Sequence, residues 1–141
     1  DSLSNNGISA LVNSLEQTVF KKPGFAEAHA QLGRYYIEIK RYPEAIASLE
    51  KALNLNPDLV LAHIQLAEVY SFTKNHTKAL DIIRHVIRSG QKLIHAYSVL
   101  GGIQMASGHH REALSSFNKV LEINPNHLSA LEYNKLIPFL Y

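Results

Sequence analysis

Short blocks of apolar residues recur in this 141-residue chain at a constant spacing of 34 residues. The first block has the form Ala-x-x-x-Leu followed by a small residue, and its copies are Ala28-Leu32-Gly33, Ala62-Leu66-Ala67 and Ala96-Leu100-Gly101. A second block keeps the same spacing at Ala45, Ala79 and Ala113. A fixed period of this length, kept without insertions, is typical of structural repeats that stack on their neighbours. The chain is therefore predicted to form an array of similar units and not one closed globule.

Within each period the apolar residues follow the i, i+3, i+4 spacing of an amphipathic helix, and the alternation typical of a strand persists nowhere. Each unit is predicted to hold two helices, over about 26–39 and 43–55, 60–73 and 77–89, and 94–107 and 110–123. Asn-Pro pairs end the second helix of two units, and Gly90 ends that of the other as a left-handed stop. Thr77 is expected to be the N-cap of its helix. The fold class is predicted to be all-α.

The period also divides the chain into segments. Residues 1–7 are polar and rich in turn formers, so we expect a disordered lead-in there. Residues 8–24 are predicted to hold one helix, the second helix of a partial preceding repeat. Full repeats are predicted over 26–59, 60–93 and 94–127, and a last helix, either a cap or the start of a further repeat, within 128–141. Because the first residue is Asp1 and not methionine, we expect a processed chain or a piece excised from a longer protein.

The composition argues against several classes of function. A formal net charge of +2 does not provide the basic surface that binds nucleic acid or anionic membranes, and the most basic stretch, from Lys78 to Lys92, is expected to be a solvated convex face. The chain has no cysteine, which excludes disulfides, thiolate metal sites and cysteine nucleophiles. No apolar run approaches the about 18–20 residues of a membrane helix, so no membrane insertion is expected. A cytoplasmic location is favoured, and periplasmic or secreted locations stay open as alternatives.

No catalytic set stands out among the polar residues. Gly101 and Gly102 are predicted to lie inside a helix, and the lysine of a phosphate-binding loop does not follow them. Ser115 and Ser116 are expected to be helical serines with no base at a useful offset. We therefore expect a non-enzymatic protein that needs no cofactor.

The eight histidines raise the question of a metal site. His76 and His110 share one turn position in consecutive units, with His109 beside the second. Equivalent atoms of successive repeats lie about 8–10 Å apart, which is too far for a shared ion, so solvated turn histidines are expected and no metal site. His29 and His63 are predicted to be buried packing residues that each need one hydrogen-bond partner, and their protonation at low pH is expected to loosen the array.

The repeated residues resemble the tetratricopeptide repeat (TPR) family, whose unit is a 34-residue helix-turn-helix. The resemblance covers 26–127 as three full repeats with flanking helices. It departs from the family pattern at His29 and His63, where the family has an aromatic residue, and at Gln104, which replaces the tyrosine seen at Tyr36 and Tyr70. The resemblance implies a right-handed superhelical solenoid of stacked helix pairs, with a concave groove lined by the first helix of each unit.

The family's groove positions are the second, fifth, ninth, twelfth and thirteenth of each unit. Transferred to this chain, they place Glu27, Leu61 and His95 at the second position. The groove residues we expect to contact a ligand are Arg34, Ile37, Glu38, Ile64, Glu68, Phe72, Ser98 and Met105. Four of these, Ile37, Ile64, Phe72 and Met105, are apolar where the core of a unit does not need them, which favours a binding surface. A clamp for chaperone carboxylates is not expected, because Arg34 is the only cation at the fifth and ninth positions and Glu68 is acidic.

The resemblance implies a protein-interaction scaffold or adaptor that binds a peptide or helix in this groove. The alternative is a recruitment appendage of an enzyme, for example a glycosyltransferase or sulfotransferase, whose catalytic domain lies outside this chain. The last segment is apolar on nearly every side, whereas a terminal cap helix has a polar outer face. Phe139, Leu140 and Tyr141 therefore indicate a continuing chain, a docked partner or self-association.

Overall fold

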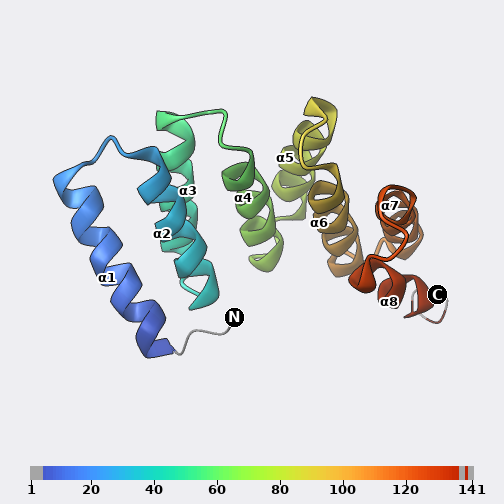
Figure 1. Ribbon diagram of the computed structural model, residues 1–141. Coiled ribbons are helices and arrows are strands. Elements are labelled where there is room, and N and C mark those ends of the chain that lie inside the picture. Colours follow the sequence, from blue (N-terminus) through green and yellow to red (C-terminus); the bar gives the residue numbers. More distant parts are fainter. Residues whose placement is uncertain (1–4, 137–138, 140–141) are drawn as a thin grey trace. The chain divides into compact units, whose positions relative to one another are not determined.

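The computed structural model describes residues 5–136 and 139, and all regular structure along 5–136 is α-helical (Figure 1). The helices are α1 (Asn5–Lys21), α2 (Ala26–Glu38), α3 (Tyr42–Leu55), α4 (Val60–Phe72), α5 (His76–Ser89), α6 (Leu93–Ala106), α7 (His110–Ile123) and α8 (Leu128–Leu136). The predicted all-α helix pairs are thus present. From α2 to α7 each helix begins and ends within one residue of the range expected from the repeat.

Two local expectations are wrong. The helix α1 begins at Asn5, so residues 5–7 belong to a helix and not to a disordered lead-in. The side chain of Ile8, the fourth residue of α1, is buried, and packing of an apolar face stabilises a helix more than local propensity does. The N-cap of α5 is Asn75 and not Thr77, because the Asn75 side chain accepts a hydrogen bond from the Lys78 backbone N–H at 3.5 Å. Gly90 takes the expected left-handed conformation, with φ of 76°.

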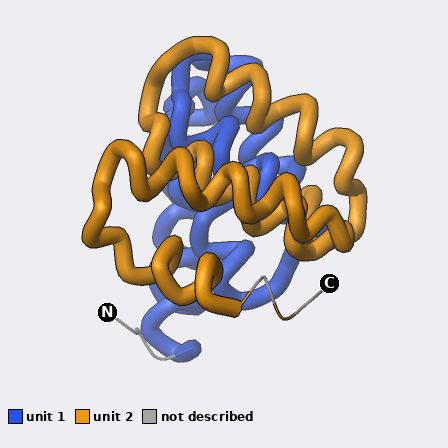
Figure 2. Tube along the Cα trace, turned by 90° about the vertical axis from the view of Figure 1, so that its right-hand side faces the viewer, with its two compact units in different colours: residues 1–69 blue, residues 70–141 orange. Residues whose placement is uncertain are grey.

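The chain divides into two compact units, residues 1–69 and 70–141 (Figure 2). The division falls inside α4, after Val69. In the first unit α1 packs on α2 and α2 on α3, while in the second α5 packs on α6, α6 on α7 and α7 on α8. Both units contain buried apolar side chains.

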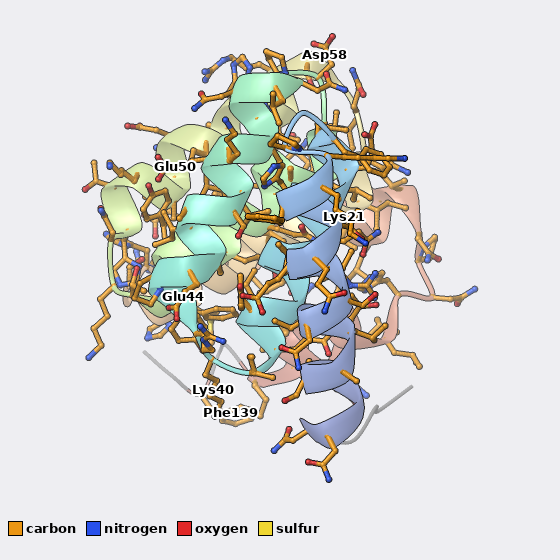
Figure 3. The ribbon with its side chains drawn as sticks, turned by 90° about the vertical axis from the view of Figure 1, so that its left-hand side faces the viewer. Lys21, Lys40, Glu44, Glu50, Asp58 and Phe139 are labelled. Carbon is orange, nitrogen blue, oxygen red and sulfur yellow. The ribbon has the colours of Figure 1, made fainter. Side chains whose placement is uncertain are left out.

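In the first unit, α2 crosses α3 at a glycine. A Cβ atom placed on Gly33 meets Leu49 Cγ at 2.5 Å, so only glycine permits this approach. The helix α1 packs on α2, where the Tyr36 hydroxyl hydrogen-bonds the Glu16 carboxylate, and burial together with that carboxylate raises the tyrosine pKa. Figure 3 shows Glu44 near the start of α3, where its carboxylate accepts from the Arg41 guanidinium at 2.8 Å. The same guanidinium lies 4.9 Å from the centre of the Tyr36 ring.

In the second unit, α6 crosses α7 in the same way. A Cβ atom on Gly101 meets Phe117 Cζ at 2.6 Å. The Phe117 ring is buried and stacks on Tyr133 of α8, with 4.7 Å between ring centres and 9° between planes. The Asn134 side chain donates to the Asn118 side chain at 2.6 Å. These contacts hold α8 on α7.

The three residues that depart from the family pattern, His29, His63 and Gln104, each have a hydrogen-bond partner. His29 Nε2 lies 2.9 Å from the Pro23 carbonyl oxygen, and His63 Nε2 lies 2.8 Å from that of Pro57. Both rings are half-buried and not buried as expected, because each lies beside the exposed turn that precedes its helix. The expected loosening of the array at low pH stays a prediction. Gln104 is buried, and its Oε1 accepts from Ser116 Oγ at 2.6 Å.

Candidate functional site

The predicted groove residues of the first unit differ in exposure. Arg34 and Glu38 are exposed on α2 and form a loose i,i+4 ion pair at 4.0 Å. Ile37 is half-buried beside them. Ile64, by contrast, is 0% exposed, so this side chain belongs to the core and is not available to a ligand. Ile64 stands at a groove position of the family, but in this chain other side chains cover it, which the repeat pattern does not predict.

Glu68 and Phe72 lie on α4. Glu68 is partly buried, and this desolvation raises the pKa of its carboxyl group. The Phe72 side chain, at the last residue of α4, is 52% exposed. Leu61, which stands at the second position of its repeat, is 50% exposed. Two apolar side chains of α4 therefore remain in solvent.

The predicted residues of the second unit also differ from one another. Met105 packs against the buried cluster around Phe117 and Val120, so this side chain fills the core of its unit, contrary to the expectation that the core does not need it. Ser98 is half-buried, and its hydroxyl donates to the Ile94 carbonyl at 2.8 Å. Its position brings it to the edge of a hollow that the sequence alone did not indicate.

A pocket of about 710 Å³ lies within the second unit, where the start of α6 faces the turn between α7 and α8. Its wall is mostly apolar, and the residues that line it are Gly90, Lys92, Leu93, Ile94, His95, Ser98, Ile123, His127 and Ser129. Clefts of about 300–1,000 Å³ accommodate drug-sized ligands, so this pocket can take several side chains of a partner. Two of the lining residues, His95 and Ser98, stand at groove positions of the family.

The polar groups around this pocket are basic or neutral. Lys92 is the N-cap of α6 and has a left-handed backbone conformation, with φ of 52°. Its side chain was expected on a solvated convex face, but the residue lines the pocket. Partial burial, and then the charge of Lys92, lower the pKa of His95. His127 Nδ1 accepts from the Ala130 backbone N–H at 3.3 Å, so the neutral ring carries its proton on Nε2.

Other types of site find little support. Within 5–136 and 139, no group of three or more His, Asp or Glu side chains is arranged to hold a metal ion. The rings of His76 and His110 are half-buried, and their Nδ1 atoms are buried without a hydrogen-bond partner, so these residues are not the solvated turn histidines we expected. They are the first residues of α5 and α7. None of the described helices is long and apolar enough to cross a membrane.

Paired helices with a period of 34 residues, glycines at the helix crossings and an apolar pocket on a first helix define a TPR protein. The family model of the cytochrome c-type biogenesis protein H TPR domain matches residues 1–131. The chain belongs to this family of TPR domains. Proteins with this fold are typically interaction modules without catalytic activity.

Solved structures share the fold at low sequence identity. The chain is similar to MamA, with a TM-score of 0.81 and 22% identity over 94% of this chain and 77% of that one. It is similar to the first TPR of Spaghetti (RPAP3), solved with an HSP90 peptide, with a TM-score of 0.73 and 24% identity over 80% and 90% of the two chains. YrrB, described as a TPR protein with an unusual peptide-binding site, has a TM-score of 0.74 and 17% identity over 89% and 65%. Among curated proteins, none matches the chain.

Proposed function

We propose that this chain is a scaffold that binds a polypeptide segment, either a peptide or a helix, on the first helices of its repeats. The observation that carries the proposal is the apolar pocket beside α6. His95 and Ser98 stand at family groove positions, and both line it. Of the eight predicted contact residues, Ser98 lines this pocket, which supports a ligand that contacts α6.

Exposed apolar residues on α4 support the same function. A half-exposed Phe72 and a half-exposed Leu61 expose apolar surface to water that a ligand can cover. Burial of one aromatic side chain stabilises a complex by about 1.5–3 kcal/mol before the costs of association. Six of the eight predicted ligand contacts are at least partly exposed, and we propose that these contact the ligand: Arg34, Ile37, Glu38, Glu68, Phe72 and Ser98.

The solved structures support a polypeptide as the ligand. The first TPR of RPAP3 holds an HSP90 peptide, and YrrB is described as having a peptide-binding site. A chaperone-type clamp on the fifth and ninth positions stays disfavoured here, because a partly buried Glu68 opposes a carboxylate. We therefore expect apolar contacts to provide most of the affinity.

The test compares capture by the wild-type chain with capture by two variants, Phe72→Ala on α4 and Ile123→Ser in the pocket. Phe20→Ala is the matched control, since Phe20 of α1 is 87% exposed and stands at no groove position. Partners lost from both variants and kept by the control are then titrated as purified proteins. We expect Kd to rise about tenfold for each variant, as truncation of an interface anchor does. Partners that bind all four proteins equally would show that the surface lies elsewhere.

The family suggests the process in which the scaffold acts. We propose that the bound polypeptide belongs to the biogenesis of c-type cytochromes, because the matching model is that of the TPR domain of cytochrome c-type biogenesis protein H. Deletion of the gene is expected to lower the level of mature c-type cytochromes, measured by haem staining of total protein. Complementation with Phe72→Ala is expected to restore less than complementation with Phe20→Ala. Unchanged cytochrome levels after deletion would contradict this role and leave peptide binding standing.

Two further proposals concern the chain's surroundings. We propose that the chain is part of a larger protein, either an adaptor or, as the alternative, a recruitment appendage of an enzyme such as a glycosyltransferase or sulfotransferase. A catalytic domain encoded next to this chain in the gene distinguishes the enzyme appendage from the adaptor.

Self-association through the C-terminal residues is also proposed, since the Phe139 side chain is 86% exposed, while Leu140 and Tyr141 lie outside the described residues. Light scattering during size-exclusion chromatography tests it, and a strict monomer at high concentration excludes it.

A further inference from the structure

The pocket beside α6 has an uneven distribution of charge. Lys92, His95 and His127 line it, and no Asp or Glu is among its nine described lining residues. The acidic residue next to Ile123 in the sequence is Glu122, and its carboxylate lies 3.5 Å from Lys119 Nζ. Glu122 is thus paired with a cation of its own helix, and it does not line the pocket. The pocket therefore combines an apolar wall with a rim that is neutral or positive.

The backbone adds to this polarity. Lys92, Leu93, Ile94 and His95, which form the N-cap and first turn of α6, all line the pocket. The first N–H groups of a helix have no partner within the helix, and they bear the positive end of its dipole. An acidic side chain often neutralises such a terminus, but within the described residues the first turn of α6 contains none, and Lys92 makes no side-chain cap. The start of α6 thus bears a positive potential that no acidic side chain of its first turn offsets.

We infer that the pocket binds a partner segment in which an Asp or Glu side chain stands next to a large apolar side chain. The apolar side chain lies on Leu93, Ile94 and Ile123, and the carboxylate is directed at Lys92, His95 and the start of α6. The inference deepens the proposed function and rests on it. A side-chain carboxylate fits better than a chain terminus, because the pocket is open to solvent and large enough for the segment to continue past it.

The protonation of His95 provides a readout of this arrangement. In the free protein, partial burial and the charge of Lys92 hold its pKa below the usual value, so the ring is neutral at pH 7. A bound carboxylate favours the protonated ring and raises this pKa. The other titratable groups of the pocket are Lys92 and His127, both basic. Binding of an acidic segment is therefore accompanied by proton uptake, and it becomes tighter as the pH falls from 8 to 6.

The experiment selects ligands from a random peptide display library with the complete 141-residue chain. We expect the selected peptides to be enriched in Asp or Glu beside Leu, Ile or Phe. The strongest is synthesised with capped ends, which removes its terminal charges, together with a partner peptide in which the acidic residue is replaced by its amide. We expect the acidic peptide to bind about fivefold more tightly at pH 7 and more so at pH 6, while the amide peptide binds equally at both values.

A matched pair of variants assigns the effect to the pocket. Lys92→Asn removes the charge and retains a residue that tolerates φ of 52°, and Lys74→Asn does the same at φ of 64° in the turn before α5. We expect Lys92→Asn to reduce the preference for the acidic peptide at least about threefold and Lys74→Asn to leave it unchanged.

The outcomes separate the two levels of the proposal. Equal affinity for both peptides, or selection of neutral or basic sequences, overturns the charge preference, and the scaffold function stands if Ile123→Ser still weakens binding. Binding that requires a free C-terminal carboxylate also overturns the inference. A library that yields no ligand for the wild-type chain contradicts both the inference and the function on which it rests.

Discussion

Neighbouring glycines in α6 have opposite surroundings. The position of a Cβ atom on Gly101 lies 2.6 Å from Phe117 Cζ and 2.7 Å from Cε1. The Phe117 ring cannot move aside, because it is buried and stacked on Tyr133. Gly102 is exposed, with no atom within 4 Å of its Cβ position. One glycine is therefore required by packing, and the other only weakens the helix.

We predict that Gly101→Ala and Gly102→Ala change stability in opposite directions. The first is expected to lower the free energy of unfolding by about 1–3 kcal/mol through overpacking. The second is expected to raise it by about 0.5–1 kcal/mol, since alanine has the higher helix propensity. Urea denaturation followed by circular dichroism measures both. Similar effects from the two variants would contradict the close crossing of α6 and α7.

At the scale of an element, a hydrogen bond joins α6 to α7 through Gln104, which stands where the two other repeats have tyrosine. The buried Ser116 hydroxyl donates to Gln104 Oε1 at 2.6 Å. The tyrosines at the equivalent positions, Tyr36 and Tyr70, instead have a cation over the ring, Arg41 at 4.9 Å and Lys78 at 5.1 Å. The third repeat thus replaces an aromatic contact with a hydrogen bond whose two partners must both be present.

We predict that Ser116→Ala destabilises the chain by about 1–3 kcal/mol, because it leaves a buried amide oxygen without its donor. Ser115→Ala is the control, since Ser115 is exposed on the same helix and its replacement is expected to change stability by less than about 0.5 kcal/mol. The double variant Gln104→Leu/Ser116→Ala is expected to recover most of the loss, because both polar groups are removed together. Thermal unfolding of the four proteins measures these differences. A double variant that is less stable than Ser116→Ala would show that the pair does not act as a unit.

At the scale of the whole molecule, the chain divides into two compact units, residues 1–69 and 70–141. In repeat proteins each segment is stabilised by its own packing and by its immediate neighbours. Damage to one unit is therefore expected to spread little. The pocket lies within the second unit, so the stability of that unit bears most directly on binding.

We predict that Gly101→Ala accelerates amide hydrogen exchange along α5 to α8 and leaves α1 and α2 nearly unchanged. The reason is that local opening follows the stability of the packed segment in which it occurs. Gly33→Ala is expected to give the reverse pattern, because Gly33 packs on Leu49 in the first unit. Mass spectrometry of peptides from exchanged protein measures both. Uniform acceleration along the chain would show that it unfolds as one cooperative unit.

The sequence by itself determined the elements of this protein. The positions of α2 to α7 and the need for small residues at Gly33 and Gly101 follow from a period of 34 residues, because helix spacing and close crossing are local and repeat with the sequence. The predicted helices and close crossings are present where the copies share small and large apolar residues, but the shared histidines His29 and His63 are half-buried and not buried as predicted. The start of α1 and the cap of α5 were misplaced because Asn5 and Asn75 lie at helix ends, where local signals compete.

Only the tertiary structure decided which apolar residues a ligand can reach. Ile64 and Phe72 are both apolar residues at groove positions, yet the first is buried and the second half-exposed. The pocket joins residues 90–98 with residues 123–129, and although the 34-residue period relates Leu93 to His127, it does not reveal that an apolar hollow lies between these segments. The physical reason is that a repeat specifies the contacts within a helix pair, while exposure depends on which side chains of neighbouring helices cover a position.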